Sequence, residues 1–271
     1  MMNYIMKPAN LFTSASLFCG LYSVMVSAGA EPADSEAFYI AALLIIYAGI
    51  FDALDGRVAR LTHTESEFGV QMDSLVDVVS FGVAPGVLLY KWGLEAYGQA
   101  GFLVAFLFTL CGVFRLARFN LTAVGDAPKT SNRYTQGLTI TAAGGMVAVL
   151  VLHHAKMRAT EVDSNISVLL LTLMLSYLMI STVKFRTFRE IRFSPLTVTT
   201  VALCIASIVF VLVRYEITLL LVLIGGTYIG SALLEEALYF AKGRKATDVY
   251  YLDDEFETNK LEDDVEEEVH A

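Results

Sequence analysis

The sequence predicts an all-α fold, a polytopic bundle of transmembrane helices. Two observations support this prediction: 56% of the 271 residues are hydrophobic and only 17% are charged, and apolar runs near 20 residues long recur along most of the chain. Soluble domains average about 25% charged residues, whereas a run of about 20 apolar residues is the length of a helix that crosses a bilayer. Because backbone groups in lipid must be satisfied internally and the runs are too long for barrel strands, each run is expected to be a helix.

Eight windows meet the length criterion, and an even number of spans places both termini on one side. They are residues 10–29, 37–58, 69–90, 98–118, 137–155, 165–183, 196–214 and 217–240. Of the 19 Lys and Arg residues, fifteen fall on the side of the termini and four on the other side. The positive-inside rule therefore predicts a multi-pass protein of the cell membrane with both termini in the cytoplasm.

The net charge of −9 is concentrated at the C-terminus. Residues 246–271 carry eleven Asp and Glu and one Lys, which leaves a net charge of +1 for the rest of the chain. Such a segment is typical of a solvated, disordered tail. Its acidity argues against nucleic acid as a partner.

Four aspartates lie in the second and third predicted spans, where charged side chains are costly and usually mark a functional site. Asp52 and Asp55 are three residues apart and Asp73 and Asp77 are four apart, so each pair shares one helical face. The link over residues 60–68 is short, which predicts antiparallel neighbouring helices. The two acidic faces should then meet near the cytoplasmic side.

Converging carboxylates repel one another unless protons or cations bind between them. Oxygen ligands suit Mg²⁺, Mn²⁺ or Ca²⁺, and no His or Cys lies nearby to favour zinc. Two divalent cations about 3.5–4 Å apart form a clamp for substitution at phosphorus, and small residues at Gly56, Ala59 and Gly69 leave space for a phosphate or nucleotide. Two alternatives stay open: solvated helix-end aspartates paired with Arg57 and Arg60, and a cation transporter. A transporter predicts acids spread across the membrane depth.

The acidic segment reads Asp52-Ala-Leu-Asp55-Gly56-Arg-Val-Ala59-Arg60, then eight residues, then Gly69-Val-Gln-Met-Asp73-Ser-Leu-Val-Asp77. It resembles the signature of the CDP-alcohol phosphotransferase family. The resemblance implies a six-helix membrane core that is usually homodimeric, in which an alcohol displaces CMP from a CDP-linked molecule. The core would occupy residues 1–190, two additional transmembrane helices residues 191–245, and the acidic cytoplasmic tail residues 246–271.

The resemblance also implies roles for individual side chains. Asp52, Asp55 and Asp73 would be metal ligands, and Asp77 would be a ligand that also accepts the proton of the attacking hydroxyl. The CDP-binding surface would comprise Asp55, Gly56, Ala59, Arg60 and Gly69. The cofactors would be two divalent cations, Mg²⁺ or Mn²⁺, with Ca²⁺ as a further candidate.

Four further segments are similar to the serine-using, bacterial-type branch of the family. They are Lys7-Pro-Ala-Asn10-Leu-Phe-Thr13 with its continuation Leu17-Phe-Cys-Gly20, Val79-Ser-Phe-Gly-Val-Ala-Pro85, Arg115-Leu-Ala-Arg118-Phe-Asn120, and Ser176-Tyr-Leu-Met-Ile-Ser181 followed by Lys184-Phe185 and Phe188. They favour CDP-diacylglycerol as donor and L-serine as acceptor. Arg115, Arg118 and Asn120 could hold the lipid phosphate or the serine carboxylate, or the arginines could anchor the helix end at lipid headgroups.

The signature defines the reaction class but not the acceptor, so glycerol 3-phosphate or an inositol phosphate, and an archaeal ether lipid as donor, stay open. This branch often has Gly-Leu-Pro-x-Pro where Gly137-Leu-Thr139-Ile-Thr141 stands here, and without the prolines the local backbone is expected to be less constrained. Asn10, Thr13 and Ser16 lie at helical spacing in the first span. They either face the nucleotide or form interhelical hydrogen bonds.

Overall fold

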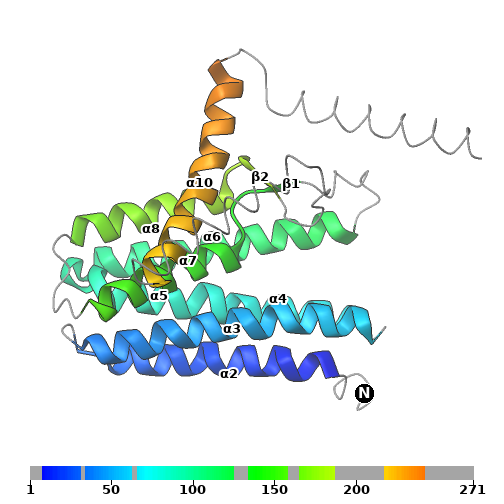
Figure 1. The fold of residues 1–271 in the computed structure, drawn as a ribbon, viewed down its shortest axis with the longest axis horizontal. Helices are drawn as coiled ribbons and strands as arrows, with labels where there is room; N and C mark the ends of the chain where they lie inside the picture. Colours follow the sequence, from blue (N-terminus) through cyan, green and yellow to red (C-terminus); the bar gives the residue numbers. More distant parts are fainter. Residues whose placement is uncertain are drawn as a thin grey trace, which may run out of the picture.

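The computed structural model describes residues 8–31, 34–62, 66–124, 134–157, 165–186 and 217–241. Most of these residues are helical, as predicted (Figure 1). The separate helices are α2 (Pro8–Gly29), α3 (Ser35–Leu61), α6 (Gln99–Val124), α7 (Ile140–Lys156), α8 (Asn165–Ile180) and α10 (Ile217–Ala241). Between α3 and α6, one helical segment is made of α4 (Glu67–Asp77), η1 (Val78–Val83), α5 (Ala84–Leu89), η2 (Tyr90–Leu94) and η3 (Glu95–Tyr97).

The helices have the length and surface of a membrane protein. Four are long and apolar enough to cross a bilayer: Ala9–Gly29, Ser35–Leu61, Phe68–Tyr97 and Gln99–Leu121. Three shorter apolar helices, Ile140–Lys156, Ile166–Ile180 and Leu221–Leu233, coincide with the predicted spans 137–155, 165–183 and 217–240. Large apolar side chains such as Leu11, Phe18 and Met25 are about 70% exposed, which suits contact with lipid. The predicted class, a polytopic all-α membrane protein, is confirmed.

Some sequence predictions fall where the structure describes no residues. These are the span 196–214, the acidic tail 246–271 and the domain boundaries at residues 190 and 245.

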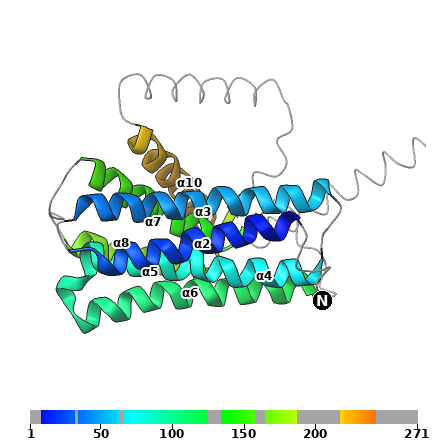
Figure 2. The same ribbon diagram turned by 90° about the horizontal axis from the view of Figure 1, so that it is seen from below.

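The first two helices support the site. α2 packs against α3 along its length and also contacts α4 and η1, while α3 contacts α7 as well. Figures 1 and 2 show α2, α3 and α4 running alongside one another. α2 and η1 approach closely at Gly20, where a Cβ atom would lie 2.6 Å from the Ser80 Oγ and 2.8 Å from its Cα. Only glycine therefore fits at this crossing.

The helical segment that contains Asp77 is not a regular α-helix. Its η1 and η2 stretches are π-helical, and η1 begins directly after Asp77. π-helical turns disturb the regular i→i−4 ladder, and in an apolar environment the backbone needs substitute partners. Thr109 of α6 donates to the Gly82 carbonyl at 3.0 Å, and Ser80 donates to the Ser16 carbonyl of α2 at 3.1 Å. The predicted span 69–90 is therefore part of a longer segment fastened to both neighbours.

A small antiparallel sheet at the ends of α7 and α8 was not predicted. β1 (Tyr134–Gln136) pairs with β2 (Lys184–Arg186), and the Gly137 amide donates to the Val183 carbonyl at 2.8 Å. Gly137 has a φ of 74°, which glycine adopts without a steric penalty. Thr139 then caps α7 by accepting from the Ala142 amide at 3.2 Å. Strand pairing and a helix cap thus give the segment that lacks the prolines hydrogen-bonded partners on both sides.

α10 crosses the bundle instead of running along it (Figure 1). It contacts α7 and β2, and the rings of Tyr228 and Phe185 lie with centroids 5.5 Å apart. α10 corresponds to the second of the two additional helices predicted beyond the core.

Candidate functional site

α3 supplies the first pair of aspartates near its C-terminal end. The helix begins after Asp34, whose side chain accepts a hydrogen bond from the Ala37 amide at 2.9 Å. Asp52 is half-buried, whereas Asp55 is only 6% exposed. The Thr13 hydroxyl on α2 donates to Asp55 Oδ2 at 2.8 Å. This bond fixes one carboxylate oxygen and leaves the other for a ligand.

α4 supplies the second pair. It begins after Ser66, whose hydroxyl accepts from the Gly69 amide at 3.2 Å. This N-cap stabilises the first turn of the helix. Asp73 and Asp77 lie one turn apart and both are half-buried. α3 ends at Leu61 and α4 begins at Glu67, so few residues separate the two acidic helices, as predicted from the sequence.

The four carboxyl groups converge. One carboxylate oxygen from each of Asp52, Asp55 and Asp73 can be chosen so that all three lie within 4.8 Å of one another. The Asp52 carboxyl also lies within hydrogen-bonding reach of Asp77. The helical spacing and the short link therefore bring together the side chains that the sequence singled out.

The donor set fits a hard divalent cation. The Oδ1 atoms of Asp73 and Asp77 are buried and have no hydrogen-bond partner among the described residues. A buried carboxylate oxygen without a partner is costly unless a cation or proton binds it. Oxygen-only ligands at this separation suit Mg²⁺, Mn²⁺ or Ca²⁺, so the cluster of Asp52, Asp55 and Asp73 is a candidate metal centre.

The residues predicted to bind CDP lie at the helix ends beside the cluster. A Cβ atom at Gly56 would meet nothing within 4 Å, so the space next to Asp55 is open. Arg60 is exposed, and its Nε donates to the Gly56 carbonyl at 3.0 Å. Ala59 is half-buried, and Gly69 lies close to Asn10, whose Oδ1 would be 3.7 Å from an added Cβ.

The three polar residues predicted near the end of α6 have different surroundings. Arg115 is only 7% exposed, and its guanidinium lies within electrostatic range of Asp77. Arg118 donates to the carbonyls of Ile180 and Gln136 at 3.2 and 3.1 Å. It therefore ties α8 to β1. Asn120 donates to the Ser74 hydroxyl at 3.0 Å, which connects α6 to α4.

Thr13 and Ser16 form interhelical hydrogen bonds, Thr13 to Asp55 at 2.8 Å and Ser16 to Ser80 at 3.5 Å, which was one of the two alternatives for them. One side chain near the site was not singled out in the sequence. Tyr228 of α10 lies within electrostatic range of Arg115. No local sequence signal identifies Tyr228, because its position depends on how α10 crosses the bundle.

The fold and the acidic cluster define a polytopic helical membrane protein with a candidate metal centre. Residues 6–179 match the CDP-alcohol phosphatidyltransferase family, a range that includes all four aspartates and Arg115. The chain belongs to this family, as its signature predicted, and is therefore an enzyme of the phosphotransferase class.

Several relatives are named CDP-diacylglycerol–serine O-phosphatidyltransferase. The chain is 37% identical to one from Helicobacter pylori over 203 residues, which cover 74% of this chain and 81% of the relative. It is 39% identical to one from Saccharomyces cerevisiae over 136 residues, 48% of each chain. A third, from Methanocaldococcus jannaschii, is 51% identical over 81 residues, 30% of this chain and 39% of the relative.

Proposed function

We propose that this protein transfers a phosphatidyl group from CDP-diacylglycerol to the hydroxyl of L-serine, giving phosphatidylserine and CMP. The observation that carries the proposal is the convergence of Asp52, Asp55, Asp73 and Asp77 at one end of two apolar helices. The names of the relatives support serine as the acceptor. We place the site, with both termini, on the cytoplasmic side of the cell membrane, where soluble serine is available.

Asp52, Asp55, Asp73 and Asp77 would hold two divalent cations, Mg²⁺ or Mn²⁺. When bound, such cations neutralise the diphosphate and stabilise CMP as it leaves. Thr13 orients Asp55 through its hydrogen bond. The open space beside Gly56 would admit the nucleotide, with Ala59, Arg60 and Gly69 around it.

Asp77 would accept the proton of the serine hydroxyl as the hydroxyl oxygen forms a bond to phosphorus. The phosphorus attacked is the one that carries diacylglycerol. Its bond to the bridging oxygen breaks, and CMP takes that oxygen and the electron pair. Arg115 is buried and lies within electrostatic range of Asp77. It would hold a phosphate oxygen or the serine carboxylate, a task that suits a guanidinium.

Release of CMP from purified protein tests the proposal. The protein is given CDP-diacylglycerol and Mn²⁺ or Mg²⁺, with serine, glycerol 3-phosphate or an inositol phosphate in separate reactions. We expect CMP with serine, and none after a chelator is added. CMP release with glycerol 3-phosphate but not with serine would refute the proposed acceptor, and release that survives chelation would refute the metal-assisted mechanism.

The cluster also bears on the transporter alternative. All four acids lie in the C-terminal part of α3 and the first part of the helical segment Phe68–Tyr97. This clustering favours chemistry at an interface over an ion pathway. From the resemblance we also propose a homodimer. Light scattering of the detergent-solubilised protein would measure its mass, and a monomer mass would refute the dimer.

A further inference from the structure

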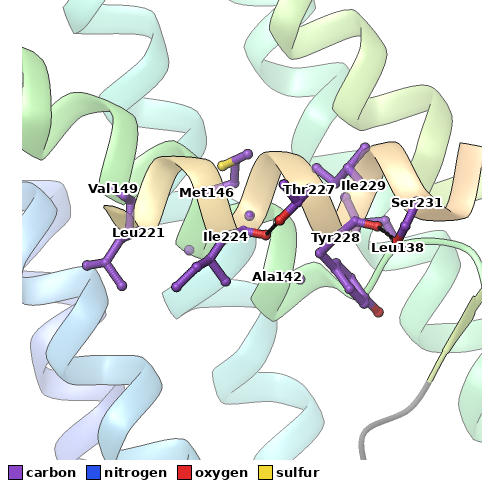
Figure 3. Close-up of a pocket in the computed structure, with 12 residues that line it drawn as sticks. Leu138, Ala142, Met146, Val149, Leu221, Ile224, Thr227, Tyr228, Ile229 and Ser231 are labelled. Atoms are coloured by element: carbon purple, nitrogen blue, oxygen red, sulfur yellow. Dashed lines mark hydrogen bonds between the residues drawn. The ribbon is translucent and has the colours of Figure 1, made fainter. Parts of the chain in front are cut away.

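A large apolar pocket lies between α7 and α10 (Figure 3). Its volume is about 710 Å³, within the range of about 300–1,000 Å³ that is typical of small-molecule sites. Most of its lining is aliphatic, from Leu138 just before α7 and Val149 on α7 to Leu221 and Ile224 on α10. Leu221 and Ile224 are 39% and 46% exposed, so the pocket opens on the side of the bundle that faces lipid.

The pocket offers few groups to a polar ligand. Two of its three hydroxyl side chains donate to the backbone of their own helix: Thr227 to the Ile224 carbonyl and Ser231 to the Tyr228 carbonyl, each at 2.9 Å (Figure 3). A polar molecule would lose hydrogen bonds with water or headgroups on entering such a site. A hydrocarbon chain would lose none.

Tyr228 links one end of the pocket electrostatically to the acidic cluster. It lines the pocket and lies within electrostatic range of Arg115, which in turn lies within electrostatic range of Asp77. Within α7 the lining runs from Ala142 to Val149. With a rise of 1.5 Å per residue, this is about 10 Å along the helix. The pocket therefore follows the apolar face of α7 away from its N-terminal end.

We propose that this pocket holds one acyl chain of the diacylglycerol donor while the diphosphate lies at the acidic cluster. The identity of the donor rests on the proposed function. The donor has a charged diphosphate at one end and apolar chains at the other. Tyr228 lines the apolar pocket and lies within electrostatic range of the buried Arg115, so the order of charged and apolar surroundings matches that of the donor. α10 lies beyond the family match of residues 6–179, so the additional helix would contribute directly to binding of the lipid substrate.

Gly145 provides a variant that fills the pocket. It lines the cavity, and a Cβ atom built there meets nothing within 4 Å, so Gly145→Leu starts from open space and adds volume to the pocket. Gly226→Leu is the matched control. It makes the same change in α10 at a position with equally open space that does not line the pocket.

The first experiment uses CDP-diacylglycerol with a photoreactive diazirine near the end of one acyl chain, bound to the full-length protein in nanodiscs with Mn²⁺. After illumination, labelled peptides are identified by mass spectrometry. We expect label on α7 and α10 in the unmodified protein, displaced by unlabelled CDP-diacylglycerol. The label should decrease in Gly145→Leu and persist in Gly226→Leu.

The second experiment compares donors with long and with four-carbon acyl chains. Even one methylene in an apolar pocket changes kcat/KM by about tenfold or more. We therefore expect Gly145→Leu to lower the ratio of long-chain to short-chain kcat/KM at least that far, and Gly226→Leu to leave the ratio as in the parent.

The inference would be overturned if the label were confined to other segments. This would occur if a second copy or another part of the chain filled the pocket. Equal behaviour of the two leucine variants would also overturn the inference. The labelling experiment does not require the protein to turn over its substrate. On the unmodified protein it also does not depend on a variant that folds correctly. CMP release with serine but label elsewhere refutes the pocket alone, whereas label in the pocket without CMP release refutes the proposed function alone.

Discussion

The hydrogen bond from Thr13 to Asp55 allows a quantitative test of the candidate metal centre. Thr13→Val keeps the shape of this buried side chain but removes the donor, which lies 2.8 Å from Asp55 Oδ2. A hydrogen bond to a charged group contributes about 1.5–3 kcal/mol, and about 1.4 kcal/mol corresponds to a tenfold change in an equilibrium constant. Loss of a partner that orients a metal ligand typically lowers metal affinity by about 10–100-fold.

We therefore expect Thr13→Val to raise the Mn²⁺ concentration needed for half-maximal CMP release by about 10–100-fold, with turnover recovering at saturating metal. The assay is a Mn²⁺ titration at fixed donor and serine. Thr172→Val is the matched control, since Thr172 is fully buried and donates only to its own helix, to the Val168 carbonyl at 2.7 Å. An unchanged titration for Thr13→Val, or an equal shift in the control, would refute the positioning role of Thr13.

Three further predictions follow from the structure. Asp77→Asn should lower turnover by about 10²–10⁴-fold, the usual contribution of a general base, and should elute normally on size exclusion. Glu95→Gln, in the same helical segment, should retain turnover. An active Asp77→Asn would exclude Asp77 as the base. Gly20→Val should destabilise the protein by about 1–3 kcal/mol because its Cβ would overlap Ser80. Gly29→Val, where an added Cβ meets nothing within 4 Å, should not lower the melting temperature, and equal melting of the two variants would contradict this. Gly137→Ala should reduce the free energy of unfolding by about 1–3 kcal/mol, and so lower the melting temperature, because φ is 74° there. An unchanged melting temperature would show that the turn tolerates a side chain.

The acidic cluster could be predicted because its geometry is local. The spacing of Asp52 and Asp55 and of Asp73 and Asp77 fixes a face on each helix, and the short link keeps the helices adjacent. Family membership followed from the same segment. The sequence was therefore sufficient for the residues that converge, although their roles are still predictions.

Other features depend on contacts between distant segments and have no local pattern. The pairing of β1 with β2 joins residues about 50 positions apart, and each strand is too short for an alternating signal. Arg118 resembled a substrate ligand in the sequence, but its partners are carbonyls on β1 and α8. Tyr228 reaches Arg115 only because α10 crosses the bundle.

The π-helical stretch directly after Asp77 lets one continuous rod serve two purposes. In an α-helix each residue turns about 100°, so an extra residue in a turn rotates everything beyond it by roughly that amount. The segment before the stretch directs its acids toward α3, and the segment after it buries Ala84, Leu88 and Leu89 in the core. The extra residue thus lets the acids face α3 while the side chains of the following turns face the core of the bundle.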